Sequence, residues 1–388
     1  LFSSSIFSQK SDAFLLLEEG KYSLSQQLFI SEFENSNFEN DKYLYHIAKC
    51  SDEINNKDAK WWYQKFLNDF PNSDYAEMAK KDLSFICFTE KDYSKTHEYL
   101  INLKKEELKD DEYYFKLAYS LFEMEQFDDS KFYFSKIKSH HNKYKILATY
   151  YYAHIAYKQE LYKTALSHFE LLQSDNSFGS IVPYYISQIH FYQKNYRKLV
   201  DYMVPILENV IQSRKEEINR LIAESYYQLA EYENAEIYFE HYLSLIEGTP
   251  KMIDYFQMGQ INIFISDYKD AIYYLEKVDG LSDSLSQFAS YYLGKAYVET
   301  GEKNFALQAF NNSSFYNFDM ELKEEALFNY AKLSYELDLP YNNLTSIADQ
   351  LDALHFSKYK KEVKRLFINM FQSTNQYQKA FDFLKIKH

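Results

Sequence analysis

A short pattern of side-chain types recurs along this 388-residue chain at a nearly constant interval, and it constrains the fold more than any other feature. The pattern places an aromatic residue three positions before a small residue and a large apolar residue four positions after it, as in Tyr232, Ala235 and Phe239. The central residues stand at positions 25, 59, 96, 130, 165, 199, 235, 271, 306, 343 and 380, separated by 34 to 37 residues, with looser copies at 59, 306 and 343. Eleven copies in phase indicate a repeat array, because a chance pattern would not hold its register over ten intervals.

A second position, twelve residues before each central residue, is also small in most copies. It holds Ala13, Ile47, Ser84, Ala118, Ala153, Ser187, Ala223, Gly259, Gly294, Ala331 and Ile368, of which nine are small. Small residues allow two helices to approach closely where they cross. The large apolar residue lies one helical turn beyond the central residue, so it can fill the space between repeats. The sequence therefore predicts that each repeat is a pair of antiparallel helices.

These features resemble the tetratricopeptide family, which repeats with the same period. The segments 228–239 and 266–275 are close to the family consensus, and the resemblance covers nearly the whole chain. It implies an all-α fold, a right-handed α-solenoid of about eleven tetratricopeptide-type helix pairs over residues 10–388. Leu199 and Pro205 depart from the pattern in the sixth repeat, as do Pro340 and Asn343 in the tenth. Since proline ends or kinks a helix, we expect bends near 200–206 and 338–345.

Charge and composition exclude several classes of function. The chain has 43 Lys and Arg against 57 Asp and Glu, a net charge of −14, and it lacks the long basic run that a nucleic-acid binder uses to contact phosphates. No apolar run approaches the ~20 residues that span a bilayer. The ten histidines form no metal-binding spacing, and phosphate-binding loops and nucleophile motifs are absent. We therefore expect no enzyme, no metal and no cofactor, and a protein or peptide as the partner.

The first nine residues, LFSSSIFSQ, combine apolar and small side chains before the chain turns polar at Lys10. This pattern is typical of the remnant of a signal peptide, so it predicts export to the periplasm or the cell envelope. The segment 68–76 is similar to a loop of periplasmic tetratricopeptide proteins, and the aromatic-rich composition resembles periplasmic scaffold proteins of Bacteroidetes. A role in a larger envelope complex follows from that resemblance. The alternative is an intracellular tetratricopeptide module that regulates a partner or senses a peptide.

The two cysteines, Cys50 and Cys87, each lie nine residues before the central residue of a repeat. Adjacent helix axes are about 8–10 Å apart, whereas a disulfide needs Cα atoms within about 7 Å. We therefore expect two free thiols in the core, although neighbouring repeats in an oxidising compartment keep a disulfide open as the alternative.

The resemblance also implies that the first helices line the concave face and that partners bind there. Three positions of these helices, three residues before the small residue and one and four after it, are mostly aromatic in repeats three to six. The candidate residues are Phe85, Phe88, Phe115, Tyr119, Phe122, Tyr150, His154, Tyr157, Tyr184 and Phe191. We interpret them as a groove for an extended peptide or an amphipathic helix. The alternative is that many of them are framework residues packed against the preceding helix.

Overall fold

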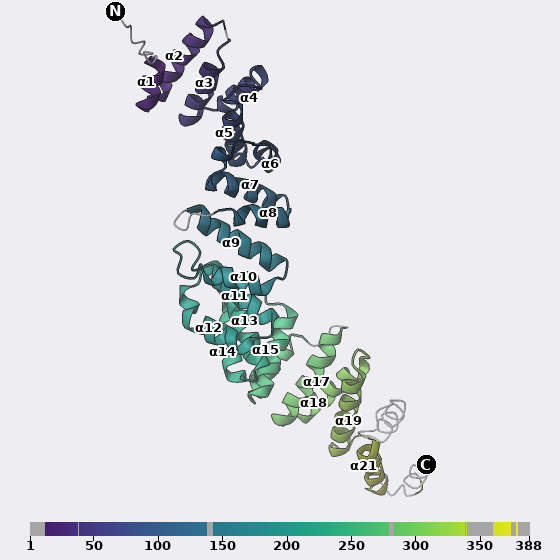
Figure 1. The fold of residues 1–388 in the computed structure, drawn as a ribbon. Coiled ribbons are helices and arrows are strands. Elements are labelled where there is room, and N and C mark those ends of the chain that lie inside the picture. Colours follow the sequence, from purple (N-terminus) through teal and green to yellow (C-terminus); the bar gives the residue numbers. More distant parts are fainter. Residues whose placement is uncertain are drawn as a thin grey trace, which may run out of the picture. The chain divides into compact units, whose positions relative to one another are not determined.

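A computed structural model describes residues 12–37, 39–137, 143–278, 283–337, 339, 360–373 and 378 of the chain. The described residues form helices joined by short turns, and none of them is in a strand (Figure 1). The all-α fold predicted from the sequence is confirmed. The chain divides into two units, Leu1–Ile189 and His190–His388, each of which is considered by itself.

Helices that follow one another in the sequence pack as pairs in both units. In the first unit they are α1 (Asp12–Glu18), α2 (Tyr22–Asn35), α3 (Asp41–Glu53), α4 (Ala59–Asp69), α5 (Ala76–Thr89), α6 (Tyr93–Ile101), α7 (Asp111–Glu123), α8 (Phe127–Ser135), α9 (Lys143–Lys158) and α10 (Tyr162–Glu170), with a 3₁₀ turn η1 (Glu106–Leu108). Helix α11 (Val182–Tyr192) contains the boundary between the units.

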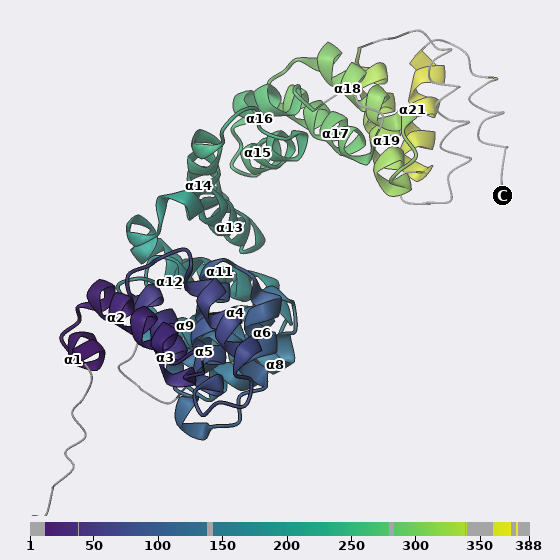
Figure 2. The same cartoon turned by 90° about the horizontal axis from the view of Figure 1, so that it is seen from above.

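The second unit continues the same order of helices. They are α12 (Tyr196–Met203), the 3₁₀ segments η2 (Val204–Asn209) and η3 (Gln212–Arg214), α13 (Lys215–Gln228), α14 (Tyr232–Leu245), α15 (Met252–Phe264), α16 (Tyr268–Leu275), α17 (Ser284–Glu299), α18 (Lys303–Phe315), α19 (Met320–Glu336) and α21 (Lys360–Ser373). Helices α17, α18 and α19 lie side by side in both views of the chain (Figures 1 and 2). The first helices of neighbouring repeats also contact one another, as α15 contacts α17 and α17 contacts α19.

The turn inside each helix pair contains one residue with a left-handed backbone. These residues are Gly20, Asn55, Lys91, Glu125, Glu160, Lys194, Ala230, Ser266 and Gly301, with φ between 52° and 81°. The N–H of the next residue donates to the carbonyl five positions earlier, as Asp92 donates to Cys87 at 2.9 Å. This bond satisfies a carbonyl at the helix end, and glycine is the residue that usually makes it possible. Seven of the nine are not glycine, so the sequence carries little sign of these turns.

The second repeat departs from the predicted register. Each left-handed residue follows the small residue of its first helix by seven positions, so Asn55 identifies Ala48 and not Ile47 as that residue. The second helix of this repeat begins at Ala59, four residues after Asn55, whereas the others begin two residues after. Ala59 and Tyr63 are nevertheless buried, at 4% and 0% exposure, and keep the small and large apolar places predicted for them. The helix begins at the small residue itself, so the aromatic residue that precedes it in most other copies is missing and this copy of the pattern is loose.

The prediction for the cysteines is confirmed in part. Cys50 and Cys87 are both free and buried, and burial raises the pKa of both thiols. The predicted equivalence of their positions is wrong, because Cys50 lies five residues before its left-handed turn residue and Cys87 lies four before. This difference of one residue lies between the cysteine and the end of the first helix. The later start of the second helix in this repeat therefore does not cause it.

The small residues of the first helices are explained by close packing on the second helices. A Cβ added to Gly294 would lie 2.7 Å from ring atoms of Phe310, and one added to Gly259 would lie 2.4 Å from Cγ of Leu275. In the first repeat the second small residue is a serine, and Ser25 Oγ donates a hydrogen bond of 2.8 Å to the carbonyl of Ala13. The two small positions therefore meet at the helix crossing, as the spacing predicts.

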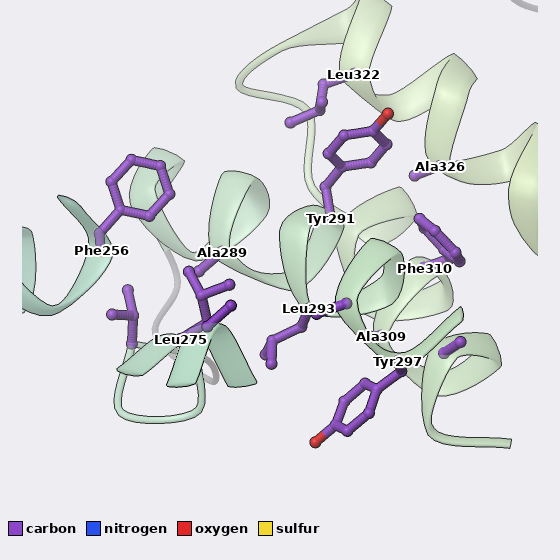
Figure 3. Close-up of a cluster of buried hydrophobic side chains, with 14 of the residues drawn as sticks. Phe256, Leu275, Ala289, Tyr291, Leu293, Tyr297, Ala309, Phe310, Leu322 and Ala326 are labelled. Atoms are coloured by element: carbon purple, nitrogen blue, oxygen red, sulfur yellow. The ribbon is translucent and has the colours of Figure 1, made fainter. Parts of the chain in front are cut away.

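The large apolar residue of each pattern fills the core between helices. Those exposed by 2% or less are Phe29, Tyr63, Leu100, Phe134, Phe169, Met203, Phe239, Leu275 and Phe310. Around Phe310, the side chains of Tyr291, Leu322 and Ala326 gather from α17 and α19 (Figure 3). One repeat thus builds its core with the first helix of the next, which is the packing expected of a repeat array.

A helix ends just before the proline of the sixth repeat, and the bend expected near 200–206 stays a prediction. Helix α12 ends at Met203, and Pro205 lies in the 3₁₀ segment that follows it. The missing N–H of proline and its ring prevent the α-helix from continuing. The segment 1–9 and the positions Pro340, Asn343 and Ala380 lie outside the described residues.

The left-handed turns lead to a stability prediction. Ala230 has φ of 58°, a conformation that costs an L-residue about 1–2 kcal/mol and glycine little. Glycine also gives the unfolded chain more conformational entropy, which offsets part of this gain. Ala230→Gly should therefore stabilise the second unit by about 0.5–1 kcal/mol, as measured by urea denaturation. The control Ala223→Gly, inside α13 and fully buried, should destabilise it by about 1 kcal/mol or more. A loss of stability in Ala230→Gly would contradict the strain argument.

Candidate protein-binding surface

The ten candidate residues lie on four first helices, and none of them is fully exposed. Phe115 and Tyr184 are buried, at 8% exposure each. The other eight are half-buried. Helices α5, α7, α9 and α11 present them at successive repeats. Phe191 belongs to the second unit, where its ring packs on Tyr196 at 5.6 Å.

Rings of neighbouring repeats contact one another in the first unit. The ring centroids of Phe88 and Tyr119 are 5.5 Å apart, and those of Tyr119 and Phe122 are 6.0 Å apart. Phe122 lies 6.0 Å from His154, which lies 6.5 Å from Tyr157. Aromatic pairs at these distances stabilise beyond their buried area. The candidate residues are therefore part of the packing between repeats, and partner binding by their exposed edges stays a prediction.

A further position of the first helix belongs to this surface and was missed in the sequence. It lies two residues before the small residue and holds Asp82, Lys116, Tyr151 and Tyr185 in repeats three to six. Tyr151 lies 4.9 Å from Tyr119 and 5.2 Å from Phe122. Tyr185 lies 5.4 Å from both His154 and Tyr157. Each of these tyrosines contacts the preceding repeat, and the same period that identified the other positions could have identified this one.

In the fourth repeat the same position places a cation among the rings. Lys116 Nζ lies 3.5 Å from the centre of the Phe85 ring and 3.0 Å from a carboxylate oxygen of Glu112. Its side chain is only 14% exposed, and burial lowers its pKa. An ammonium over a ring face is attracted by the ring quadrupole. This contact holds the Phe85 ring between α5 and α7.

Two hydrogen-bonding groups of the surface stay uncharged at neutral pH. Burial, and then the charge of Lys158, lowers the pKa of His154 to about 4. Burial, and then a hydrogen bond with Glu123, raises the pKa of Tyr119. Among the described residues, Nδ1 of His154 has no hydrogen-bond partner. The middle of this surface is therefore neutral and aromatic, which suits apolar side chains of a partner.

The histidines predict how stability changes with pH. His46, packed against the rings of Phe14 and Phe29, also has a pKa lowered to about 4, chiefly by burial. In the unfolded chain histidine binds its proton near pH 6.5, so folding stability is complete above that pH and falls as the pH drops from 6.5 to 4. After allowance for solvent screening, each histidine should cost about 1 kcal/mol at pH 5.

Urea denaturation at pH 7.5 and pH 5.0 measures this loss. The double variant His46→Gln and His154→Gln should lose less stability between the two pH values than the natural chain. The variant His241→Gln, at an exposed position, is the control and should lose as much stability between the two pH values as the natural chain does. An unchanged pH dependence in the double variant would contradict the assignment.

The second unit contains a small cavity at the corresponding place. It has a volume of about 80 Å³ and lies between α13 and α15, against Tyr227, Gln257 and Ile261. Gln257 stands two residues before Gly259, the position that Lys116 and Tyr151 occupy in the first unit. The Oε1 atom of Gln257 is buried and has no hydrogen-bond partner among the described residues. The surface is thus more polar here than in repeats three to six.

Large apolar side chains are also exposed outside the first helices. Trp61, Phe132 and Phe305 on the second helices are exposed by 53%, 52% and 56%. Phe315 and Phe318, at and after the end of α18, are exposed by 73% and 58%. Single exposed rings of this kind are common on protein surfaces and do not by themselves indicate a binding site.

Among the described residues, no group of three His, Cys, Asp or Glu side chains is placed to hold a metal ion. None of the described helices is long and apolar enough to cross a membrane.

Comparison with known proteins gives structural neighbours of low sequence identity. No known family profile matches the chain, and no curated protein matches it. The C-terminal part of a TPR repeat-containing protein from Cytophaga hutchinsonii is 18% identical, with a TM-score of 0.40 over 64% of this chain and 93% of that one. A tetratricopeptide repeat protein from Parabacteroides merdae is 16% identical, with a TM-score of 0.39 over 66% of this chain and 98% of that one. The structure of Naa15/Naa10 bound to HypK-THB is 13% identical, with a TM-score of 0.38 over 96% of this chain and 61% of that one. In the register of its own helix pairs and turns, the described part of the protein is an all-α array of helix-pair repeats, and their period of 34 to 37 residues is that of tetratricopeptide repeats.

Proposed function

We propose that this protein is a non-catalytic scaffold that binds a partner peptide or helix along the first helices of repeats three to six. One observation carries the proposal: five candidate rings of the first unit pack on one another and are only half-buried, namely Phe88, Tyr119, Phe122, His154 and Tyr157. A ring that is already fixed loses little conformational entropy when a partner covers it. Such rings are efficient anchors for binding.

The chemistry of the surface defines the expected partner. The neutral middle around Tyr119 and His154 favours apolar or aromatic side chains. Hydroxyl groups at its edge can exchange hydrogen bonds with a peptide, as Tyr157 already donates to Gln188. A partner helix with apolar residues on one face meets both requirements.

Site-specific photo-crosslinking in native cells tests the surface directly. A photo-reactive phenylalanine at Phe85 or at Tyr157 should capture the same protein, whereas one at the exposed Trp61 of the same unit should not. With that protein purified, Phe85→Ser should weaken binding by tenfold or more, and Trp61→Ser should leave it unchanged. Phe85 is preferred to Tyr119 because its ring lies against the cations Lys116 and Lys81. Tyr119 instead packs on the ring of Phe88 and so supports the neighbouring repeat. Equal binding by both folded variants would refute the groove.

The location in the cell envelope is part of the same proposal. The apolar and small residues of segment 1–9 support export. Fractionation of native cells, with cytoplasmic and periplasmic marker proteins, should place the chain with the periplasmic markers. Recovery with the cytoplasmic markers would favour the intracellular regulatory role instead.

A further inference from the structure

A second concave site lies in the second unit, away from the candidate rings. Helices α17 and α18 and the end of α16 enclose a cavity of about 320 Å³. Its floor is formed by Leu293, Tyr297 and Ala309, which are all buried. Figure 3 shows the Tyr297 ring directed away from Tyr291 and Phe310, with its hydroxyl outermost. The cavity is at the lower end of the range of about 300–1,000 Å³ for ligand pockets, which is a suitable size for one long side chain.

The rim of the cavity combines a carboxylate, an exposed ring and two amides. Tyr297 donates a hydrogen bond of 2.5 Å to Oε1 of Glu276, which holds this carboxylate at the mouth of the cavity. The ring of Phe305 is 56% exposed and stacks on Tyr297, with centroids 5.4 Å apart and an angle of 30° between the planes. Gln308 and Asn312 complete the rim from the next turns of α18.

The charge of the lining is one-sided. Among the described residues that line the cavity, Glu276 is ionisable to an anion and none is a lysine or an arginine. The whole chain carries a net charge of −14, so its long-range field also attracts cations. The amide oxygens of Gln308 and Asn312 can accept further hydrogen bonds from a cationic donor.

We propose that this cavity receives an arginine side chain of a protein partner. The guanidinium would donate to the Glu276 carboxylate while its plane lies against the outer face of Phe305. Both interactions use the planar fork of arginine, which a lysine ammonium lacks. The aliphatic stem would cover the floor at Leu293 and Ala309. The proposal rests on the scaffold function in requiring a protein partner, but it uses none of the candidate rings of the first unit.

The test uses the full chain and a small probe in place of the unidentified partner. The probe is the blocked tripeptide acetyl-Gly-Arg-Gly-amide, titrated by ligand-observed NMR at low salt. Its analogues contain lysine or citrulline in place of arginine, citrulline being the neutral isostere. We expect saturable binding of the arginine peptide, at least threefold weaker binding of the lysine peptide and at least tenfold weaker binding of the citrulline peptide.

Protein variants locate the binding. Glu276→Gln should weaken binding of the arginine peptide by at least fivefold, and Phe305→Ser by about threefold or more. The matched controls are Glu299→Gln on α17 and Phe315→Ser on α18, both exposed, and these should bind as the natural chain does. Phe85→Ser should also bind normally, so failure of the groove proposal does not affect this test. Circular dichroism confirms that each variant is folded.

Four results would overturn the arginine site. The first is that the arginine peptide shows no saturable binding. The second and third are that the citrulline peptide binds as tightly as the arginine peptide, or that Glu276→Gln binds the arginine peptide as tightly as the natural chain does. The fourth is that neutral maltotriose binds, and Phe305→Ser abolishes this binding, while the arginine peptide does not bind. The last result would assign the cavity to a saccharide, since a ring with amides and a carboxylate also suits sugar hydroxyls.

Discussion

Replacing Phe310 by alanine is expected to lower the free energy of unfolding of the second unit by about 3–5 kcal/mol. The side chain is 2% exposed and lies among Tyr291, Leu322 and Ala326 (Figure 3). On its other side it fills the space left by Gly294, where a Cβ would lie only 2.7 Å from the ring. Truncation therefore removes contacts with two helices, α17 and α19, and the glycine backbone cannot move a side chain into the void.

An exposed phenylalanine on the same helix provides the control. Phe315 ends α18 and is 73% exposed, so Phe315→Ala should change the unfolding free energy by about 0.5 kcal/mol or less. Urea denaturation followed by circular dichroism gives the global stability. Hydrogen exchange of α17–α19 shows whether the loss is local, because repeats of an array can open separately. Similar losses in the two variants would contradict the packing described for Phe310.

Replacing Gln287 by leucine is expected to cost the second unit about 2–4 kcal/mol. This side chain is fully buried. Its Nε2 donates to the carbonyl of Asp319 at 2.7 Å, and its Oε1 accepts from the N–H groups of Phe318 and Asp319 at 3.1 and 2.8 Å. Leucine fills a similar volume and satisfies none of these three backbone groups. Because such groups are costly when they lose their partners away from water, the turn between α18 and α19 should open.

Hydrogen exchange detects this opening at the two amides concerned. Exchange of the Phe318 and Asp319 N–H groups should accelerate in Gln287→Leu more than exchange in α14, which makes no such bond. Gln212→Leu, at an exposed position of the same unit, should leave both exchange and stability unchanged. Unchanged protection of the two amides in Gln287→Leu would show that the side chain does not hold the turn.

These two residues also show how far the sequence could predict the fold. Phe310 occupies the large apolar place of the repeated pattern, and its burial follows from the period alone. Gln287 stands outside the recurrent positions of the pattern, and its partners are 31 and 32 residues away in the sequence. The same place, seven residues before the small residue of the first helix, holds Glu77 in the third repeat, which accepts from the N–H groups of Lys104 and Lys105 at 3.0 and 2.7 Å. The role therefore recurs with a different residue type, which a pattern of small and apolar residues does not show.

The candidate surface was predictable to the same extent. The period placed the ten residues on successive first helices, and the structure finds them there. It did not indicate that Phe115 is buried while Phe85 is half-buried. That difference depends on the residue that the following repeat supplies: the rings of Tyr144 and Tyr151 approach Phe115 within 5.5 and 6.3 Å, whereas the side chain over Phe85 is Lys116.

The sequence by itself determined that the chain consists of helix pairs, where most of them begin, and which residues meet at their crossings. These properties depend on spacings of three, four and twelve residues, which the helix geometry converts directly into contacts. Only the tertiary structure decided the left-handed turns at residues such as Lys91 and Ala230, the extra turn residues after Asn55, and the cavity beside Glu276. Each of these results from side chains and backbone brought together by packing, whose energy can outweigh the local preference of a residue. Local preference alone would have predicted glycine at every turn.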